Sequence, residues 1–355
     1  SEGVLSKSEK NALDETLLEK RFRSLGTGEY GIADLDVTQL GTGLSLPFRD
    51  VTALKNEAMK QLNGEQSLIP EVILPKLTSY PKSEADKQPA LSLLICDEAD
   101  VHLADETDAD IYFKLPDAYK RNCTKYIGFL QDNPRLIPWF PAVLIGKDYD
   151  VAVNILEQVM PPLIITNNTG IPFLNTTNSY ALMAMKEDFD CHGAFISNEL
   201  NRMQMKNIAR PENFKLFYSI YHPILLMTSR QCFFQQSVGC EKPRIDNGCM
   251  LSCDKSTSIT NMKGMSFAID KQKAGYPSIY NEDQFLNMEV MNDLSDLFDG
   301  FMIDLTNIGA GDKVSPDKVA LISQFEQLLA GDKQVEDTLN SMVPASTVSQ
   351  YHAGL

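Results

Sequence analysis

The chain of 355 residues lacks several features that mark common classes of protein. No apolar run approaches the roughly 18 residues of a membrane-spanning helix, and the first ten residues, SEGVLSKSEK, contain no apolar core of a signal peptide. The sequence has only 4 histidines, none of them paired at helical spacing, and no H-E-x-x-H, G-x-S-x-G or P-loop motif. The start of the sequence leaves export open, and the localisation that we expect is cytoplasmic. A classical hydrolytic centre has little support.

The chain also has few positively charged residues, which limits how much of its surface can bind nucleic acid. There are 32 Lys and Arg against 48 Asp and Glu, a net charge of −16, so the whole surface is not suited to phosphate backbones. Residues 200–280 are the exception, because 11 Lys and Arg there stand against 5 Asp and Glu, a local +6 that leaves −22 for the rest. This basic region is a candidate surface for a polyanion.

Short apolar runs alternate with helix-like segments from residue 90 onwards. The predicted strands cover 91–96, 109–115, 136–145, 162–166, 193–197, 214–221 and 298–305, and the helix-like segments include 148–160 and 198–208. Apolar strands that alternate with amphipathic helices indicate a parallel sheet buried on both faces. The sequence therefore predicts an α/β fold, for which a (β/α) barrel, complete or with units missing, is the natural closure.

The composition divides the chain into three regions. Residues 1–62 are predicted to be a small α+β segment, residues 63–89 a proline-containing linker of mixed charge, and residues 90–355 a barrel-like domain. A helix is predicted over 50–62, with Asp50 as its N-cap and Gly64 just past its end.

The last predicted helix has clear boundaries in the sequence. Ser315 is its expected N-cap, Pro316 its first residue, and Gly331 the residue that ends it.

Polar residues follow several predicted strands. They include Asn167, Asn168, Asn198, Glu199 and His222. In a barrel, the carboxyl ends of the strands form the active face, although asparagine after a strand usually forms a turn and a glutamate can simply favour a helix start. We take Glu199 and His222 as candidate catalytic residues on this edge.

Four of the 7 cysteines lie in one stretch, RQCFFQQSVGCEKPRIDNGCMLSC (230–253). The spacing is Cys232-x7-Cys240-x8-Cys249-x3-Cys253. These cysteines could fill a core, form two disulfides or bind a metal. The surroundings are polar, which disfavours a core position, and a chain with a large core has little need of disulfides. The isolated Cys96, Cys123 and Cys191 fit the core well.

Metal binding is the hypothesis that the residues favour. Four thiolates can surround one soft metal centre, and Lys242, Arg244 and Lys255 would offset their charge. Structural zinc sites usually have short spacings in both pairs, so the x7 and x8 gaps lean mildly toward an iron–sulfur cluster. The spacing by itself leaves zinc and iron–sulfur open.

Five segments in order resemble the second half of the long members of a collagenase-like peptidase family, family 32 among peptidases of unknown catalytic type. They are SNELN (197–201), FKLFYSIYHPILLMTSRQC (214–232), GCEKPRIDNGCMLSCDK (239–255), YPSIYN (276–281) and FMIDL (301–305). Residues 22–62 are similar to the end of a domain inserted between the two halves of those proteins. The resemblance implies a barrel-like fold and a chain that is the C-terminal part of a longer protein.

The resemblance also implies a chemistry. Family members whose role is understood bind a 4Fe–4S cluster through cysteines and hydroxylate RNA bases or ubiquinone precursors without molecular oxygen. The long bacterial members are similar to the enzyme that makes 5-hydroxycytidine in 23S ribosomal RNA, with prephenate implicated as the hydroxyl source. Carried over residue by residue, the cluster ligands are Cys232, Cys240, Cys249 and Cys253.

One position departs from the pattern of the family. Its N-terminal halves have a cysteine four residues after a histidine, and here that position after His222 is Leu226. Three hypotheses therefore stay open. The chain is part of an iron–sulfur RNA-modifying enzyme whose partners are ribosomal RNA and its own N-terminal half, a collagenase-like peptidase, or a binding module with a structural zinc or iron–sulfur site.

Overall fold

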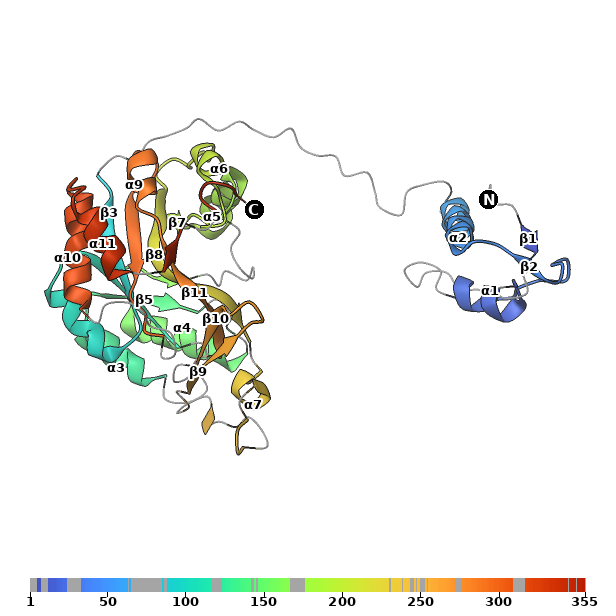
Figure 1. Cartoon of the computed structure of the whole chain (residues 1–355), viewed down its shortest axis with the longest axis horizontal. Helices are drawn as coiled ribbons and strands as arrows, with labels where there is room; N and C mark the ends of the chain where they lie inside the picture. Colours follow the sequence, from blue (N-terminus) through green and yellow to red (C-terminus); the bar gives the residue numbers. More distant parts are fainter. Residues whose placement is uncertain are drawn as a thin grey trace. The chain divides into compact units, whose positions relative to one another are not determined.

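The chain divides into two compact units, Ser1–Thr78 and Ser79–Leu355 (Figure 1). The computed structural model describes residues 5–7, 12–23, 33–62, 64, 85, 88–116, 123–141, 144, 146–166, 176–229, 231–237, 239–242, 246, 248–249, 253, 255–271, 276–308, 317–343, 345–348 and 350–354. Most of the predicted linker 63–89 lies outside these residues, as do Asn167 and Asn168, so the linker stays a prediction.

The smaller unit has two short strands and two helices. They are β1 (Ser6–Lys7), α1 (Glu15–Phe22), β2 (Leu44–Ser45) and α2 (Phe48–Leu62), and β1 pairs antiparallel with β2. Asp14 caps α1, since its side chain accepts from the N–H of Leu17 at 2.7 Å. The prediction that Asp50 is the N-cap of α2 is wrong. The helix begins at Phe48, and the N–H of Asp50 already donates to the carbonyl of Pro47.

The larger unit alternates strands and helices in its first half. Its elements there are β3 (Ala90–Ile95), η1 (Glu98–Asp105), β4 (Asp110–Lys114), α3 (Lys125–Asp132), β5 (Leu136–Phe140), α4 (Lys147–Val159), β6 (Ile165–Thr166), α5 (Ser179–Phe189), β7 (Gly193–Phe195) and α6 (Arg202–Lys206). These strands overlap the predicted ones, with β3 starting one residue earlier than predicted. Helix α6 is shorter than predicted because Asn201 and Gln204 form a capping box at its start.

The second half of this unit adds a long strand and an antiparallel ribbon. Its elements are β8 (Lys215–Thr228), α7 (Phe233–Ser237), β9 (Ser256–Thr260), β10 (Ser266–Asp270), β11 (Ser278–Leu286), α9 (Glu289–Asp293), β12 (Gly300–Asp304), α10 (Lys318–Leu329), α11 (Val335–Met342) and β13 (Ser346–Thr347). Strands β9, β10 and β11 do not appear among the predicted strands.

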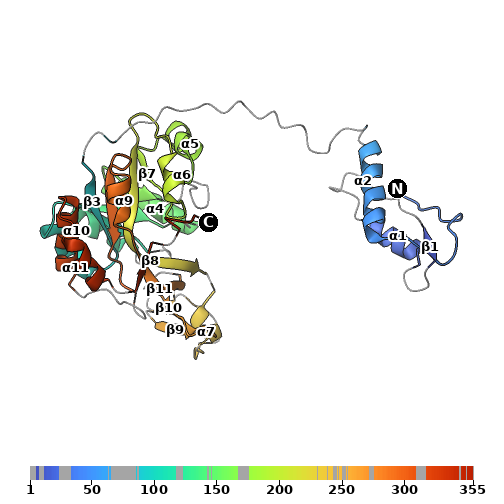
Figure 2. The same ribbon diagram turned by 45° about the horizontal axis from the view of Figure 1, so that its top comes forward.

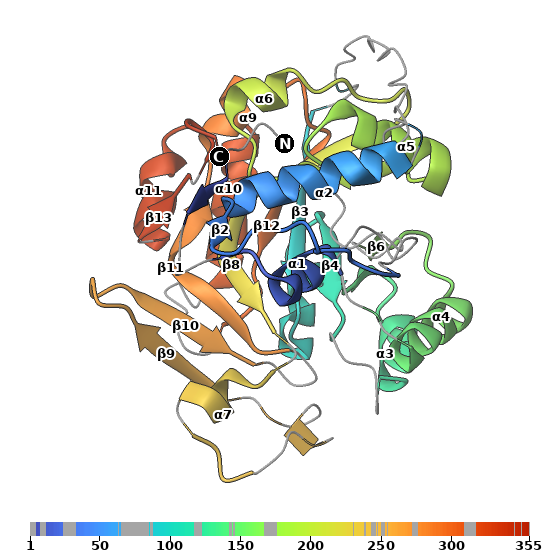
Figure 3. The same ribbon diagram turned by 90° about the vertical axis from the view of Figure 1, so that its right-hand side faces the viewer.

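One sheet joins the described strands of the larger unit. Its order is β6-β5-β4-β3-β12-β8-β11-β10-β9, with β7 also on β8 and β13 on β11. The pairs from β6 to β8, and β7 with β8, are parallel, whereas β8-β11-β10-β9 is an antiparallel ribbon (Figure 3). The predicted α/β class with a mostly parallel sheet is confirmed.

Helices cover one face of this sheet. Leu93 and Ile95 of β3, Ile303 of β12 and Ile155 of α4 are fully buried in one large core, which also includes Phe325 of α10. Helix α10 packs on β3 and on α11 (Figure 2). Burial on this scale is the main stabilising contribution to the fold, at about 25 cal/mol per Å² of apolar surface removed from water.

The other face of the sheet carries aromatic side chains and is called the aromatic face here. Leu94, Tyr112 and Met302 are buried on it, and Trp139 and Phe195 pack against them. The ring centroid of Phe195 in β7 lies 6.2 Å from that of Tyr112 in β4. Four strand spacings separate β7 from β4 in the sheet, which is roughly 19 Å in a flat sheet. The sheet is therefore strongly curled, with the aromatic face on the inside.

Closure into a barrel is not found. Within the described ranges no pairing joins β6 to β7, so the curled sheet keeps two ends. The barrel therefore stays a prediction.

The predicted start of the last long helix, with Ser315 as N-cap and Pro316 as first residue, is wrong, whereas its predicted end is confirmed. Ser315 and Pro316 lie outside the described residues. Helix α10 begins at Lys318, and the side chain of Asp317 accepts from the N–H of Ala320 at 2.9 Å, so Asp317 is the N-cap. Gly331 follows the helix with φ +96°, which suits glycine. In the part of the chain that the structure describes, no helix is long and apolar enough to cross a membrane.

Candidate functional site

Strand β8 connects the parallel sheet to the cysteine segment. Its first half pairs with β12 and β7, and its second half pairs with β11 in the ribbon. Residues 229–255 then connect β8 to β9, with α7 lying beside the β9 end of the ribbon (Figure 3). The cysteine segment is thus attached to the ribbon that leaves the carboxyl-terminal edge of the sheet.

All four predicted ligands are free, half-buried thiols. Cys232 directly precedes α7, whose Phe234 is buried at 2% exposure and anchors the helix. Cys240 accepts a hydrogen bond at 3.9 Å from the ammonium of Lys255. Partial exposure without disulfides leaves these thiols accessible to a metal ion. Disulfide bonds among them are absent from the described structure.

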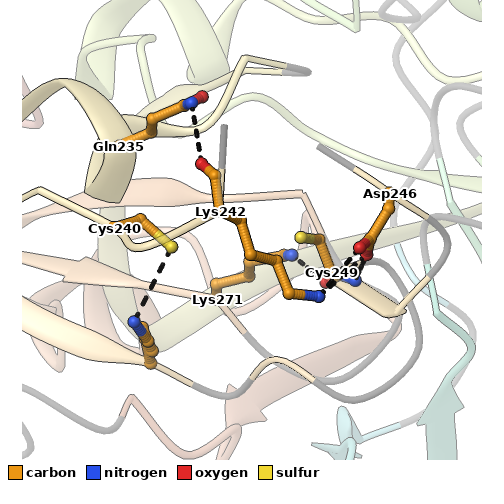
Figure 4. A network of polar contacts seen from close by, with 7 residues as sticks. Gln235, Cys240, Lys242, Asp246, Cys249 and Lys271 are labelled. Atoms are coloured by element: carbon orange, nitrogen blue, oxygen red, sulfur yellow. Dashed lines mark hydrogen bonds and ion pairs between the residues drawn. The ribbon is translucent and has the colours of Figure 1, made fainter. Parts of the chain in front are cut away.

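Polar contacts tie the segment together around Cys249 (Figure 4). The carboxylate of Asp246 accepts from the N–H of Cys249 at 2.9 Å and from Lys242 at 3.0 Å. The ammonium of Lys271, buried at 3% exposure, donates to the carbonyl of Cys249. The Lys242 hydrogen bond, helped by the N–H of Cys249, lowers the pKa of Asp246 to about 2. Asp246 is therefore ionised at neutral pH and holds the turn before Cys249.

The three basic residues that were predicted to offset the charge of the thiolates do not all contact a thiol. Lys255 lies against a thiol as predicted, whereas Lys242 pairs with Asp246, and Arg244 lies outside the described residues. Lys271, which the sequence did not single out, contacts the backbone of the segment instead.

The four sulfurs fit a soft metal in chemistry but do not form one ligand group. Four cysteines free of disulfides on a segment of 22 residues (232–253) are the donor set that zinc or an iron–sulfur cluster takes. Among the described residues, no three His, Cys, Asp or Glu side chains lie close enough together to hold a metal ion. Any metal bound by these cysteines must therefore rearrange the segment, as is common where metal binding and folding are coupled.

The two predicted catalytic residues lie near the carboxyl edge of the parallel sheet. Glu199 follows β7 as predicted, whereas His222 does not follow a strand but lies within β8, because β8 continues to Thr228 in the ribbon. Glu199 is exposed, four residues after β7. His222 is half-buried, stacks on Phe285 with ring centroids 4.5 Å apart, and shares a hydrogen bond with Ser219 at 2.9 Å. The amide of Asn198 donates to the carbonyl of Ser219 at 2.8 Å, which links the segment after β7 to β8.

The Ser219–His222 hydrogen bond resembles the contact between a catalytic nucleophile and its general base. The surroundings of the two residues do not suit that role. Ser219 is only 7% exposed. Burial lowers the pKa of His222 to about 4, so this imidazole is a weak base at neutral pH. The pair therefore gives the peptidase hypothesis little support.

A third group of polar residues, which was not among the predicted sites, lies on the aromatic face. Lys114 ends β4 and Asp304 ends β12, both at the carboxyl edge. Burial raises the pKa of Asp304 although Lys114 and Thr306 act against it, and burial raises the pKa of Tyr280 with Lys114 and Asp304 as charged neighbours. A charged residue at the end of a buried apolar strand, as in IYFKL and FMIDL, could have indicated this group.

No protein-family model, no curated protein and no solved structure matches this chain.

Proposed function

We propose that the chain is the C-terminal part of an iron–sulfur enzyme that modifies RNA, by oxygen-independent hydroxylation of a cytidine in 23S ribosomal RNA. The observation that carries the proposal is the set of four half-buried cysteines on one segment, none of them in a disulfide. Their resemblance to the cluster ligands of the collagenase-like family supports iron–sulfur over zinc. The cluster would supply redox chemistry or order the substrate loop.

The finer fold is part of the same proposal. The strands β3 to β8 with β12 would form a barrel-like unit with its open side between β6 and β7. The contact between Phe195 and Tyr112 supports this, because it joins strands that are far apart in the sheet. The carboxyl edge of the sheet, where Lys114, Asp304 and His222 lie, would then be the reactive mouth.

RNA as the partner is supported by charge and by position. Lys255 is exposed at the end of the segment, and Lys263 is exposed between β9 and β10 of the ribbon beside it. They lie in the basic region 200–280 of an otherwise acidic chain. An acidic chain with one basic region favours local contact with a few phosphates. The N-terminal half of the same protein is the second proposed partner.

Metal content tests the proposal first. Protein purified under nitrogen should be brown, absorb broadly in the visible blue and contain iron and sulfide. The Cys249→Ser variant should lose most of this metal, because each thiolate of a four-ligand site contributes to its affinity. Cys191→Ser is the matched control, since Cys191 is a half-buried thiol outside the segment, and it should keep the metal.

Two results would count against the metal proposal. A colourless protein with stoichiometric zinc would replace the iron–sulfur enzyme by the zinc-binding module. Unchanged metal content in Cys249→Ser would remove the segment as the ligand source.

The substrate is tested in cells. A strain that lacks the gene should lose 5-hydroxycytidine from its 23S ribosomal RNA by mass spectrometry, and the full-length gene should restore it. A full-length gene that carries Cys191→Ser is the control and should restore the modification as well. Retention of the modified base in the deletion strain would refute the RNA function even if the protein contains iron.

A further inference from the structure

The described helices contribute to the core on the opposite face of the sheet, whereas the group of buried and partly buried residues on the aromatic face comes from strands, four of which supply its rings. Trp139 of β5 lies 5.9 Å from Tyr112 of β4 and 5.6 Å from Phe195 of β7, measured between ring centroids. The ring of Phe195 lies 5.3 Å from that of Phe217 in β8. Strands from both ends of the curled sheet therefore contribute to one group of rings.

Three of these rings keep part of their surface accessible. Tyr112 is buried at 2% exposure, whereas Trp139, Phe195 and Phe217 are half-buried. Aromatic side chains that are completely enclosed only stabilise a core, but half-exposed ones can stack on a planar ligand.

Polar groups border the rings at the carboxyl edge. The register pairs Lys114 with Trp139 across β4 and β5, so both side chains are on the same face. Asp304 pairs with Leu94 of the aromatic face, and Tyr280 of the ribbon has Lys114 and Asp304 as electrostatic neighbours. One cation, one carboxyl group and one phenol thus stand next to the accessible rings.

We propose that the aromatic face binds a single unstacked nucleobase, stacked on Trp139, Phe195 or Phe217, with Lys114 directed to its phosphate. This inference rests on the proposed function, because it takes RNA as the substrate. Flat aromatic side chains accept any base through its π-face, and an enzyme that modifies a base must take it out of its stack. Asp304 and Tyr280 offer hydrogen bonds to the edge of the base.

The net charge of the chain supports one nucleotide rather than a long strand in this site. With −16 overall, the chain repels extended phosphate backbones, whereas one lysine beside the rings suits one phosphate. The salt dependence of binding should accordingly correspond to about one released counterion.

The single tryptophan of the chain makes the test direct, because Trp139 is the only such residue and lies in the proposed site. Cytidine 5′-monophosphate should quench the fluorescence of Trp139 saturably in the full chain, with and without metal. Ribose 5-phosphate, which has no base, should not. Lys114→Ala should weaken the nucleotide by about tenfold, the loss expected for one charge-assisted contact. Lys333→Ala is the control, because Lys333 is exposed between α10 and α11, and should bind as the wild type does.

A second variant tests the site independently, in case Lys114→Ala fails to fold. Phe195→Leu keeps an apolar side chain and should weaken the nucleotide severalfold while the melting temperature stays close to that of the wild type. The site is refuted if the nucleotide leaves the fluorescence unchanged, if ribose 5-phosphate quenches equally well, or if both variants bind normally. Benzoate binding without nucleotide binding would replace the nucleobase by a free aromatic acid. These outcomes are independent of metal content and of the ribosomal RNA assay, so each proposal can fail separately.

Discussion

Protonation of His222 is expected to make the stability of the sheet depend on pH. His222 stacks on Phe285 and bonds to Ser219, and burial lowers its pKa to about 4 from the ordinary value of 6.5. At neutral pH the imidazole is therefore uncharged in the folded protein. In the unfolded chain it takes up a proton at a higher pH than in the folded protein, so its contribution to stability is present above pH 6.5 and is lost as the pH falls toward 4.

We predict a measurable loss of stability from this residue alone. Between pH 7 and pH 5 the free energy of unfolding should fall by about 2 kcal/mol more in the wild type than in His222→Gln, which has no proton to bind. Urea unfolding at the two pH values measures the difference.

His192→Gln is the matched control for this experiment. His192 is an exposed histidine, so its replacement should leave the wild-type pH dependence intact. If His222→Gln loses stability with pH as steeply as the wild type does, His222 is not held neutral by its surroundings.

At the scale of elements, one ion pair fixes the starts of two central strands. The carboxylate of Asp299, directly before β12, accepts from Arg210 at 2.6 Å and from the N–H of Leu216 in β8 at 2.8 Å. The Arg210 side chain is 5% exposed and that of Asp299 is 19% exposed. The pair is therefore poorly solvated, and loss of one partner leaves the other charge uncompensated.

Arg210→Leu should destabilise the larger unit by about 3 kcal/mol in urea unfolding. Arg202→Leu provides the comparison, because Arg202 contacts Asp293 at 2.9 Å but its side chain is 51% exposed, and the loss there should stay below about 1 kcal/mol. Equal losses in the two variants would show that burial does not decide the strength of these pairs.

The elements also show how far a sequence can be interpreted without a structure. Strands β3, β4 and β12 are predictable because they are buried on both faces and appear as continuous apolar runs. Strands β9 and β10, with the sequences STSIT and SFAID, are not, since their stability comes from pairing in the ribbon rather than from an apolar pattern.

The candidate site also has a part that the sequence predicts and a part that it does not. The four cysteines can be grouped from the sequence because they lie close together along the chain. The neighbourhood of Lys114, Asp304 and Tyr280 cannot, because it depends on strand register and on the curl of the sheet. The sequence also does not determine whether the four thiols come close enough to share a metal, because that depends on how the segment folds. In the described structure they do not form a ligand group.

At the scale of the whole molecule, the position of β12 has a consequence for how the protein is made. This strand lies between β3 and β8, although residues 96–299 separate it from β3 in the chain. A ribosome therefore completes β3 and β8 long before the strand that joins them exists.

Until β12 emerges, the nascent chain exposes two unpaired strand edges, which invite association with other chains. Parallel pairing over such a sequence distance is also slow, because the intervening loop must close first. Productive folding of the larger unit thus waits until β12 has been synthesised, and β3 and β8 keep open edges until then.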